Sequence, residues 1–351
     1  MSAGLRRRQV CHGLLCACAP WPRSGADPAA CPQPCLAAPL AGTFLQPLVG
    51  LRGLTADEWC RRLAYLPAFG ARELVLQWLE LDQVSFVAGD ATAASAESTA
   101  FLAPLLAAAA DLGVQVHLGL TADTGFGAAL QADPATLDGY LAKLRTASLA
   151  TARAAFAQTA GSPAFAGWYL PEEIDDVNWR EPARLHLLAA HLRELCRGLQ
   201  EISGKPVSVS TYVTGATSPD RFGLSWLRIL LEAPLTVLLQ DGAGVSEQRW
   251  RGMDPYVEAL RDVAASLDRP WAMVIELFVQ QSGPPIDDQP FSARPAELAR
   301  VSAQIEHARR LGAPRLLGFT IGDYLLAGPA GDPNALGSAY LSAFCEAAGR
   351  S

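Results

Sequence analysis

The strongest constraint on the fold is a regular alternation of two sequence patterns that begins near residue 42. Short β-branched or aromatic runs alternate with longer segments that carry Ala, Leu and Arg at helical spacing. The alternation repeats eight times. We expect strands at 42–47, 73–81, 114–120, 165–173, 206–213, 235–240, 270–278 and 315–324. We expect helices from Thr55 onward and at 98–112, 134–159, 181–202, 220–232, 247–267, 295–311 and 337–348.

Two local signals mark helix ends. Thr55 is followed three residues later by Glu58, which is the spacing of a capping box at a helix start. Gly204 follows the helical segment 181–202 and is expected to stop it, because glycine adopts the left-handed conformation that ends many helices.

The alternation predicts an α/β fold with a parallel sheet, because strands separated by helices pair through right-handed crossovers. Eight strand–helix units match the closed (β/α)8 barrel, or TIM barrel. A doubly wound open sheet is the alternative, but no glycine-rich phosphate loop follows the first strand. We therefore expect a single barrel over residues 41–351, preceded by an extension over residues 1–40.

The charge balance narrows the classes of partner. The 351-residue chain has 28 Lys and Arg against 35 Asp and Glu, a formal net charge of −7, and no basic tract. Such a chain is a poor candidate for binding nucleic acid or anionic lipid. A neutral small molecule or a polysaccharide is the better expectation.

The first 40 residues have the outline of a signal peptide. MSAGLRRR is basic, QVCHGLLCACA is short and mostly apolar, and small residues follow. The stretch LCAC also resembles a lipoprotein cleavage site. We therefore expect export to the periplasm or the exterior, with a lipid anchor as one form, or a cytoplasmic protein if this segment is only an extension. No later segment has the roughly 18 apolar residues of a membrane helix.

The cysteines concentrate in the same extension. Five of the eight lie in the first 35 residues, and Cys60, Cys196 and Cys345 are scattered over the body. We expect neither a disulfide framework nor a metal site in the body. Cys31 and Cys35 are close enough in sequence to pair, but the interpretation we favour is a variable tail.

One stretch, GWYLPEEIDDVNW (167–179), ends a strand-like run in four carboxylates: Glu172, Glu173, Asp175 and Asp176. No Lys or Arg lies among them. Active sites of these barrels form at the carboxyl ends of the strands, so the two glutamates are candidate site residues. The two aspartates precede the next helix, where negative charge is favourable, and we interpret them as turn residues.

A second carboxylate, Glu276, interrupts the apolar run AMVIELF. It must be hydrogen-bonded or functional, because burying a bare charge is costly; an ion pair with a helix arginine is the structural alternative. Glycoside hydrolysis needs one protonated carboxyl and one ionised carboxyl, whose pKa values are separated by burial and mutual repulsion. We predict that Glu173 and Glu276 flank a bound sugar.

Other polar and aromatic side chains at the expected strand ends suit carbohydrate recognition, since sugars stack on aromatic rings and amides bind hydroxyl groups. About half of the aromatic residues are expected in the core instead, Trp168 and Trp271 first. The candidate substrate-binding residues are Gln46, Gln77, Trp78, His117, Tyr169, Trp179, Tyr212, Gln240, Asp241, Asp323 and Tyr324.

The stretches GTFLQP, ELVLQW, GWYLPEEIDDVNW, LLQDGAGV and WAMVIELF resemble the domain-of-unknown-function family 4434, over residues 42–325. These are glycosidase-like TIM barrels related to the clan A glycoside hydrolases. The resemblance implies Glu173 as the acid/base residue at the end of strand 4 and Glu276 as the nucleophile at the end of strand 7. Glu172 stands where the clan has Asn or Asp, so it remains the alternative catalytic residue. The resemblance does not supply a substrate.

The leading hypothesis is therefore a retaining hydrolase of a polysaccharide or oligosaccharide that needs no cofactor and no metal. A carboxyl separation much beyond about 5.5 Å would favour inversion instead. A carbohydrate-binding barrel without catalysis is the first alternative. A metal-dependent isomerase or aldolase barrel is the second, although among the five histidines only His117 falls at an expected strand end.

Overall fold

The structure is a computed structural model. Almost all of the expected extension 1–40, with its signal-like segment, lies outside the residues that it describes, as does the end of the last expected helix. The described residues are 35, 37–87, 100–159, 161–283, 286–287, 289–328 and 331–346.

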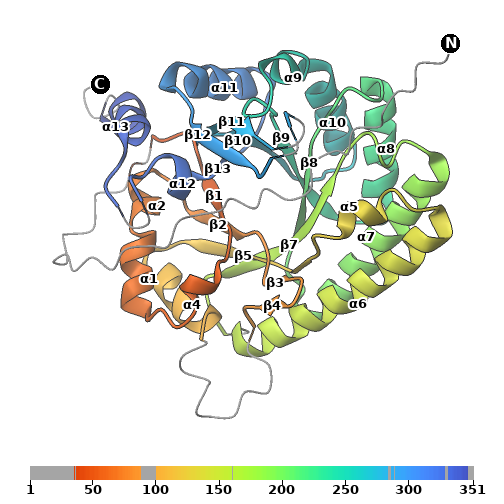
Figure 1. Ribbon diagram of the computed structural model, residues 1–351, viewed down its shortest axis with the longest axis horizontal. Coiled ribbons are helices and arrows are strands. Elements are labelled where there is room, and N and C mark those ends of the chain that lie inside the picture. The colour runs from red at the N-terminus through yellow and green to blue at the C-terminus, as the bar shows by residue number, and fades with distance from the viewer. Residues whose placement is uncertain are drawn as a thin grey trace.

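Eight parallel strands close into a barrel, which confirms the predicted fold class (Figure 1). The strands follow one another around the ring in chain order, and the last pairs with the first. They are β1 (Gly42–Leu45), β2 (Glu73–Leu76), β5 (Gln115–Gly119), β7 (Phe165–Ile174), β8 (Val207–Thr211), β9 (Leu235–Gln240), β10 (Trp271–Glu276) and β13 (Leu316–Phe319).

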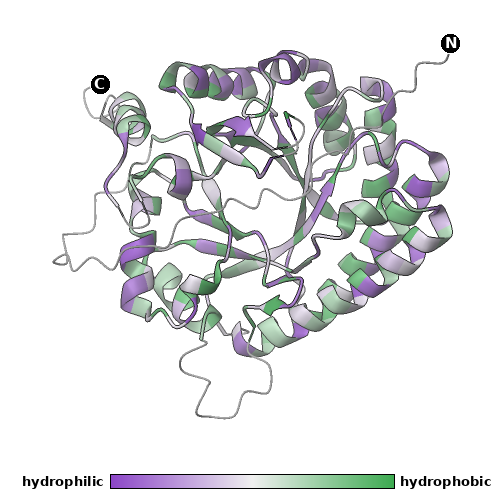
Figure 2. Cartoon of the chain, in the orientation of Figure 1, coloured by the Kyte–Doolittle hydropathy of each residue, from purple (hydrophilic) through white to green (hydrophobic). Residues whose placement is uncertain are grey.

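The larger helices lie outside this barrel (Figure 1). Figure 2 shows that they carry both hydrophobic and hydrophilic residues, as expected for helices that cover a sheet and face solvent on the other side. They are α1 (Ala56–Leu63), α4 (Leu102–Asp111), α6 (Pro134–Thr159), α7 (Pro182–Ser203), α8 (Pro219–Glu232), α9 (Glu247–Arg251), α10 (Asp254–Ser266), α11 (Leu298–Arg310) and α13 (Ala335–Leu341).

Both helix-end signals are confirmed. The Thr55 side chain accepts a hydrogen bond from the Glu58 amide, and the Glu58 carboxylate accepts one from the Thr55 amide, which completes the capping box. Gly204 has φ of +66° and ends α7, because a residue with a Cβ is strained in that conformation.

Shorter elements surround the barrel ends. A three-stranded sheet and a hairpin lie beside the carboxyl ends of the barrel strands. These elements are η1 (Val49–Leu51), α2 (Tyr65–Ala68), β3 (Glu80–Leu81), β4 (Val84–Ser85), β6 (Thr121–Ala122), α5 (Phe126–Ala129), β11 (Phe278–Ser282), β12 (Ser292–Pro295), α12 (Ile321–Tyr324) and the π-helical turn η3 (Ser342–Glu346).

Several boundaries differ from the sequence prediction, and three of them bear on the barrel mouth or on the number of helices. The helix expected at 247–267 is two helices, α9 and α10, because Pro255 has no amide hydrogen to continue the first and fits the first turn of the second. The second barrel strand ends at Leu76, and Glu80 belongs to the small sheet. The last barrel strand ends at Phe319, so Asp323 and Tyr324 lie in α12.

A disulfide joins Cys35 to Cys345, which corrects the expectation of a body without disulfides. The bond ties the segment before β1 to the end of the described chain, across a separation of 310 residues. Because the two half-cystines lie at opposite ends of the sequence, only the closure of the barrel brings them together. Cys196 is a buried free thiol.

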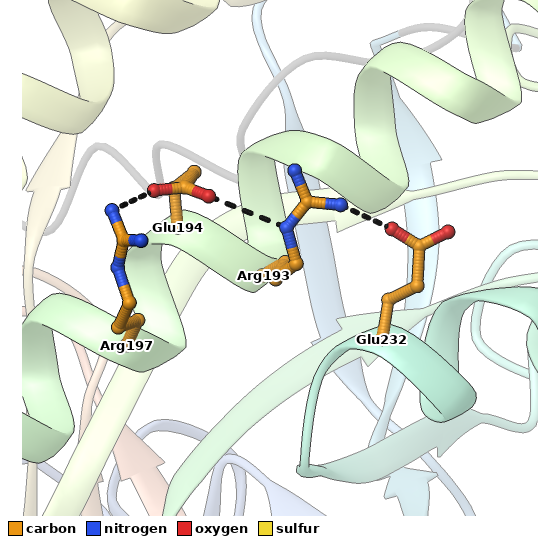
Figure 3. Close-up of polar contacts among 4 residues, drawn as sticks. All are labelled: Arg193, Glu194, Arg197 and Glu232. Atoms are coloured by element: carbon orange, nitrogen blue, oxygen red, sulfur yellow. Dashed lines mark hydrogen bonds and ion pairs between the residues drawn. The ribbon is translucent and has the colours of Figure 1, made fainter.

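Ion pairs on the outer wall connect α7 to α8 (Figure 3). Arg193 binds Glu194 at 3.3 Å and reaches Glu232 of α8 at 2.7 Å, while Glu194 also pairs with Arg197. Each of these four side chains is at least a quarter exposed. Every carboxylate in this group therefore has a guanidinium beside it.

Among the described residues, none of the helices has the length and apolar character needed to cross a membrane.

Candidate active site

The two candidate glutamates of β7 have different surroundings. Glu173 lies in the barrel mouth, where its Oε1 accepts a hydrogen bond from the Gln240 Nε2 of β9 at 3.0 Å. Glu172 lies 3.0 Å from the Nε2 of His191 on α7. Adjacent side chains of a strand point to opposite faces. The strand therefore directs Glu173 into the centre of the mouth, whereas Glu172 turns toward His191 of α7 and borders the mouth only at its outer side.

Glu173 and Glu276 line one small cavity in the mouth, which we call the inner cavity. It encloses about 300 Å³ of empty space, part of it open to solvent. β7 and β10 supply the two carboxylates, with β8 and β9 between them in the ring. The cavity is lined by Phe44, Gln77, Tyr169, Glu173, Ser210, Gln240, Val274, Glu276 and Phe319.

Glu276 ends β10 and is 4% exposed. Its Oε2 accepts a hydrogen bond from the Gly244 amide at 2.6 Å. A Cβ on residue 244 would lie 2.8 Å from that oxygen and 2.7 Å from Phe278, so glycine allows this close approach. Burial, and then the negative charge of Asp241, raise the pKa of Glu276 to about 8.

Asp241 contacts the backbone of Glu276 and has no exposed surface. Its Oδ1 accepts the amides of Ala243 and Glu276, and its Oδ2 accepts Gln304 Nε2 at 2.5 Å. Burial raises the pKa of Asp241 to about 6. Asp241 lines neither of the two cavities at the mouth, so the structure does not place it where a substrate in them would touch it.

An arginine also lies near this pair. The Arg300 guanidinium donates to the backbone oxygen of Glu276 at 3.1 Å, and it does not form an ion pair with the carboxylate. Its charge opposes the rise of both carboxyl pKa values, but burial outweighs it. The ion pair with a helix arginine, which the sequence left open for Glu276, is not present.

Glu173 is less enclosed than Glu276. Removal from water raises its pKa, the hydrogen bond from Gln240 opposes that rise, and the nearby Asp175 adds to it. Both carboxyls of the inner cavity therefore take up protons more readily than free carboxyls do. A site that keeps one carboxyl protonated near neutral pH can supply a proton to a leaving group.

The two aspartates after β7 organise the loops of the mouth. Asp175 accepts the amides of Val177 and Asn178 at 2.7 and 2.5 Å. Asp176 accepts the amide and the hydroxyl of Thr214, each at 2.7 Å, and so ties this loop to the one after β8. Both are turn residues, as expected, although neither caps α7, whose N-cap is Glu181.

A larger outer cavity opens beside Glu173. It encloses about 930 Å³ of empty space, part of it open to solvent, and its walls are mostly apolar. It lies over the carboxyl ends of β2, β5 and β7. The lining residues are Gln77, Trp78, Leu81, Thr121, Ala122, Asp123, Thr124, Phe126, Leu130, Leu144, Pro171, Glu172, Glu173, Asp175, Asn178 and Tyr212.

Several expected substrate-binding residues lie on these two cavities. Gln77 lines both of them and accepts a hydrogen bond from Gln46 at 2.8 Å. Trp78 lines the outer cavity, and its indole nitrogen donates to the Pro47 oxygen, which fixes the ring. Tyr212 lines the outer cavity, with its hydroxyl 3.4 Å from Asp175.

Gln240 and Tyr169 line the inner cavity. Gln240 is the amide that binds Glu173. The Tyr169 hydroxyl donates to Ser210 Oγ at 2.9 Å, and its ring packs edge-on against Phe44. The structure therefore brings these two residues to the candidate catalytic pair.

His117 does not lie at the mouth. It is 3.8 Å from Glu73, at the amino end of β2, and Arg315, which precedes β13, binds the same carboxylate at 3.1 Å. Burial, and then Arg315, lower the pKa of His117 to about 4. Its expected contact with substrate is therefore dropped, because His117 is the middle residue of β5 and its ring lies beside groups at the amino end of the barrel.

Three other expected contacts also lie off both cavities. Trp179 is 3% exposed, and Arg184 stacks on it at 5.9 Å, so it is a core residue and not a wall of the cleft. Asp323 is exposed on α12 and accepts the Thr320 hydroxyl. Tyr324 is buried against Phe278, with the ring centroids 5.4 Å apart.

The sequence reasoning missed several groups that shape the site. The hydrogen bond from the Gly244 amide to Glu276 could not be predicted, because glycine has no side chain and the loop after β9 sets the position of its amide. Asp123 and Phe126 come from a loop and the short helix α5, which the strand–helix pattern did not register. Ser210 could have been predicted, because Ser208 and Ser210 alternate with valines along the run VSVST and therefore share one face of the strand.

The described residues contain no group of three or more His, Cys, Asp or Glu side chains arranged to hold a metal ion.

Comparison with known proteins identifies a family and one related protein. The family described as "Domain of unknown function (DUF4434)" matches residues 40–335. The uncharacterised protein YbcH of Escherichia coli (strain K12) is 32% identical over 272 residues, which are 76% of this chain and 85% of YbcH.

Among solved structures, a candidate alpha-L-fucosidase from Bacteroides thetaiotaomicron superposes with a TM-score of 0.64 at 15% identity, over 92% of this chain and 99% of that one. Xylanase 10B from Thermotoga maritima gives 0.48 at 11% identity, over 90% and 97%. At these identities the likeness concerns the fold alone, which is that of glycoside hydrolase TIM barrels. The match over most of its length shows that the chain belongs to the DUF4434 family.

Proposed function

We propose that this protein is a glycoside hydrolase that acts on a polysaccharide or oligosaccharide through Glu173 and Glu276. One observation carries the proposal: the two carboxyl groups line one cavity at the barrel mouth, and burial raises the pKa of both. Two carboxyls with different surroundings around one cleft are what glycosidic bond hydrolysis requires.

The cavities suggest how the roles divide. Glu173 lines both the inner and the outer cavity, whereas Glu276 lines only the inner one. A bond between a sugar in one cavity and a leaving group in the other would therefore pass Glu173. This position suits the proton donor, and the enclosed position of Glu276 suits attack on the anomeric carbon from within.

In the proposed reaction, Glu173 gives its proton to the glycosidic oxygen as the bond to the anomeric carbon breaks. The Glu276 carboxylate forms a bond to that carbon and gives a covalent glycosyl–enzyme. Glu173, now ionised, takes a proton from water, whose oxygen displaces Glu276 and releases the sugar. This is the retaining course, in which one residue acts first as acid and then as base.

The pKa of Glu276 is about 8, which favours a protonated Glu276 near neutral pH, the reverse of the form that a nucleophile needs. For the proposed roles, Glu276 must be ionised and Glu173 protonated when the substrate is bound. The Gly244 amide favours the ionised form of Glu276, and a developing positive charge on the sugar favours it further. The assignment of roles therefore depends on rescue experiments as well as on loss of activity.

The test begins with a glycan panel that identifies a substrate of the wild-type protein. Glu173→Gln and Glu276→Gln should each lower kcat/KM on it by about 10²-fold or more. Azide should rescue small glycine variants with retained stereochemistry at Glu173 and inverted stereochemistry at Glu276. Glu194→Gln, on the outer wall, is the matched control and should keep full activity.

Undiminished turnover in both Gln variants would refute the proposal. Tight oligosaccharide binding in calorimetry, with no cleavage by any preparation, would instead indicate a carbohydrate-binding barrel without catalysis.

We also propose that the protein is exported. The Cys35–Cys345 disulfide supports this, because disulfides form and persist in oxidising compartments and are rare in a reducing cytosol. Thiol labelling followed by mass spectrometry should find both cysteines blocked in protein recovered from the native host. Free thiols at both positions, with the protein in the cytoplasmic fraction, would contradict export.

A further inference from the structure

The outer cavity carries an unusual balance of charge. Four of its lining residues are carboxylates: Asp123, Glu172, Glu173 and Asp175. The described lining residues include no Lys, Arg or His. The rest of the wall is largely apolar, with the rings of Trp78 and Phe126 among it. A ligand in this cavity would meet negative charge and aromatic faces together.

Glu172 and Asp175 are buried, Asp123 and Glu173 are half-buried, and hydrogen bonds from the protein hold Asp123 and Asp175 in place. The Asp123 carboxylate accepts the Gly125 amide and the Tyr140 hydroxyl, each at 2.7 Å. Asp175 accepts the two backbone amides described above. These hydrogen bonds orient the charges, but none of them brings in a cationic side chain. Arg184, which is not among the described lining residues, interacts electrostatically with Asp175, and burial raises the pKa of Asp175. The hydrogen bonds described for Asp123 come only from the Gly125 amide and the Tyr140 hydroxyl, and neither group is a cation.

Glu172 gives an independent indication of a ligand. It is 5% exposed and lines the cavity, and its Oε1 pairs with His191. Its Oε2 is buried and has no hydrogen-bond partner among the described residues. Leaving a buried carboxylate oxygen unpaired costs about 1–3 kcal/mol or more, so a donor supplied by a ligand would remove an existing penalty.

We propose that the outer cavity binds the amino group of an amino sugar, so that the substrate class of the proposed hydrolase is a glycan with free-amine hexosamine units. This proposal rests on the proposed function for its connection to catalysis. An ammonium group supplies positive charge and three hydrogen-bond donors to the carboxylates, and it also interacts favourably with an aromatic face. A uronic acid or a sulfated sugar would place like charges together and would be excluded.

Neutral sugars are the competing occupants, because carboxylates also accept hydrogen bonds from hydroxyl groups. The absence of Lys, Arg and His among the described lining residues favours the amine, since a neutral ligand would bring no positive charge to the carboxylates of the wall. The two ligands differ in their response to salt, because only the charged contact is screened.

The experiment compares matched monosaccharides by NMR titration of the wild-type protein. The probes are glucosamine, galactosamine and mannosamine, each against its parent hexose and its N-acetyl derivative, with glucuronate as the anionic probe. We expect at least one hexosamine to bind about tenfold more tightly than both neutral counterparts, and glucuronate not to bind. High salt should reduce this preference.

Two variants test whether the preference for hexosamines over neutral sugars arises in the outer cavity. Asp123→Asn removes one charge with little change in size and should weaken hexosamine binding severalfold more than it weakens the binding of the neutral counterparts. Glu232→Gln, on the outer wall, is the control and should keep the preference. Thermal melting of both variants confirms that each is folded.

Equal or weaker binding of every hexosamine relative to its neutral counterparts, including the absence of any binding, would overturn the inference. So would a preference that Asp123→Asn leaves intact. Because binding is measured without turnover, a hexosamine preference with active Glu173→Gln and Glu276→Gln variants would refute the proposed catalytic pair and leave this inference standing.

Discussion

The acidic side chains of the outer wall and those of the barrel mouth differ in their exposure to solvent and in the groups that they contact. On the outer wall, Glu194 and Glu232 are 27% and 26% exposed, and each lies beside an arginine (Figure 3). In the mouth, Glu276 is 4% exposed, and its nearest polar partner is a backbone amide. The two regions lie on one fold and use the same residue type.

The difference separates carboxylates that add slightly to the free energy of unfolding from carboxylates that reduce it when they are ionised. Exposed ion pairs contribute about 0–1 kcal/mol each, and their loss is minor. A buried carboxyl without a cation is destabilising when ionised, so its pKa rises, as it does for Glu276 and Asp241. Perturbed carboxyls that converge on a cavity are typical of functional sites.

The largest effect is expected where a buried carboxylate loses its partner. His191→Ala removes the described partner of the buried Glu172 carboxyl, since His191 is 1% exposed and lies 3.0 Å from Glu172 Oε1. We expect a loss of about 3–5 kcal/mol in the free energy of unfolding, measured by chemical denaturation. His186→Ala is the control, because His186 is an exposed histidine of the same helix that contacts Arg228. Similar losses in the two variants would contradict the distinction.

The second effect concerns pH and the stability of the mouth. The pKa of Glu276 is about 8 in the folded protein against an ordinary 4.5, so the unfolded chain gives up this proton first as pH rises. Glu276 therefore makes stability fall with pH between about 4.5 and 8. Glu276→Gln has no ionisable group at this position, so this fall in stability with rising pH should be absent from the variant.

In thermal melting, Glu276→Gln should exceed the wild-type Tm by about 2–4 °C or more at pH 8, with the difference shrinking toward pH 4.5. Glu194→Gln should follow the wild-type pH dependence, because Glu194 is paired with arginines at the surface. A constant Tm difference across this range would show that Glu276 ionises normally.

The third effect tests the like-charge contact beneath the site. Asp241→Asn removes a negative charge next to Glu276 and should lower the pKa of Glu276 by about one unit, which corresponds to about 1.4 kcal/mol. Burial should still hold that pKa above its ordinary value. The measurement is a carbon-13 NMR titration of glutamate carboxyls, assigned with Glu276→Gln. An unchanged or higher pKa would remove Asp241 as a cause.

The smallest effect is expected on the outer wall. Glu232→Gln weakens the contact with Arg193 and should cost no more than about 1 kcal/mol, with a smaller loss at high salt. Activity on any substrate should be unchanged. A loss as large as that of His191→Ala would mean that this ion-pair group is a structural determinant after all.

The fold could be predicted from the sequence to a large extent because its signals are local. Hydrophobic period, the Thr55 capping box and the glycine after α7 each act within a few residues, and all eight barrel strands lie where the pattern expects them. The boundaries that differed were set by contacts beyond the pattern, such as the pairing of β12 with β11, which delays the start of α11.

The site was predicted less completely. Sequence position put Glu173 and Glu276 at strand ends, and the structure brings them to one cavity. The same reasoning gave His117 and Trp179 a place at the mouth, although the first lies near the amino end of the barrel and the second in the core. The carboxyl separation that distinguishes retention from inversion also depends on geometry alone.

The sequence by itself determined the order of strands and helices and the residue types at the strand ends, because these follow from short-range periodicity. Only the tertiary structure decided which of two adjacent glutamates faces the mouth, which carboxylates are left without a cation, and that Cys35 meets Cys345. The physical reason is that burial, pKa and pairing depend on groups far apart in the chain, and the closed barrel is what brings those groups together.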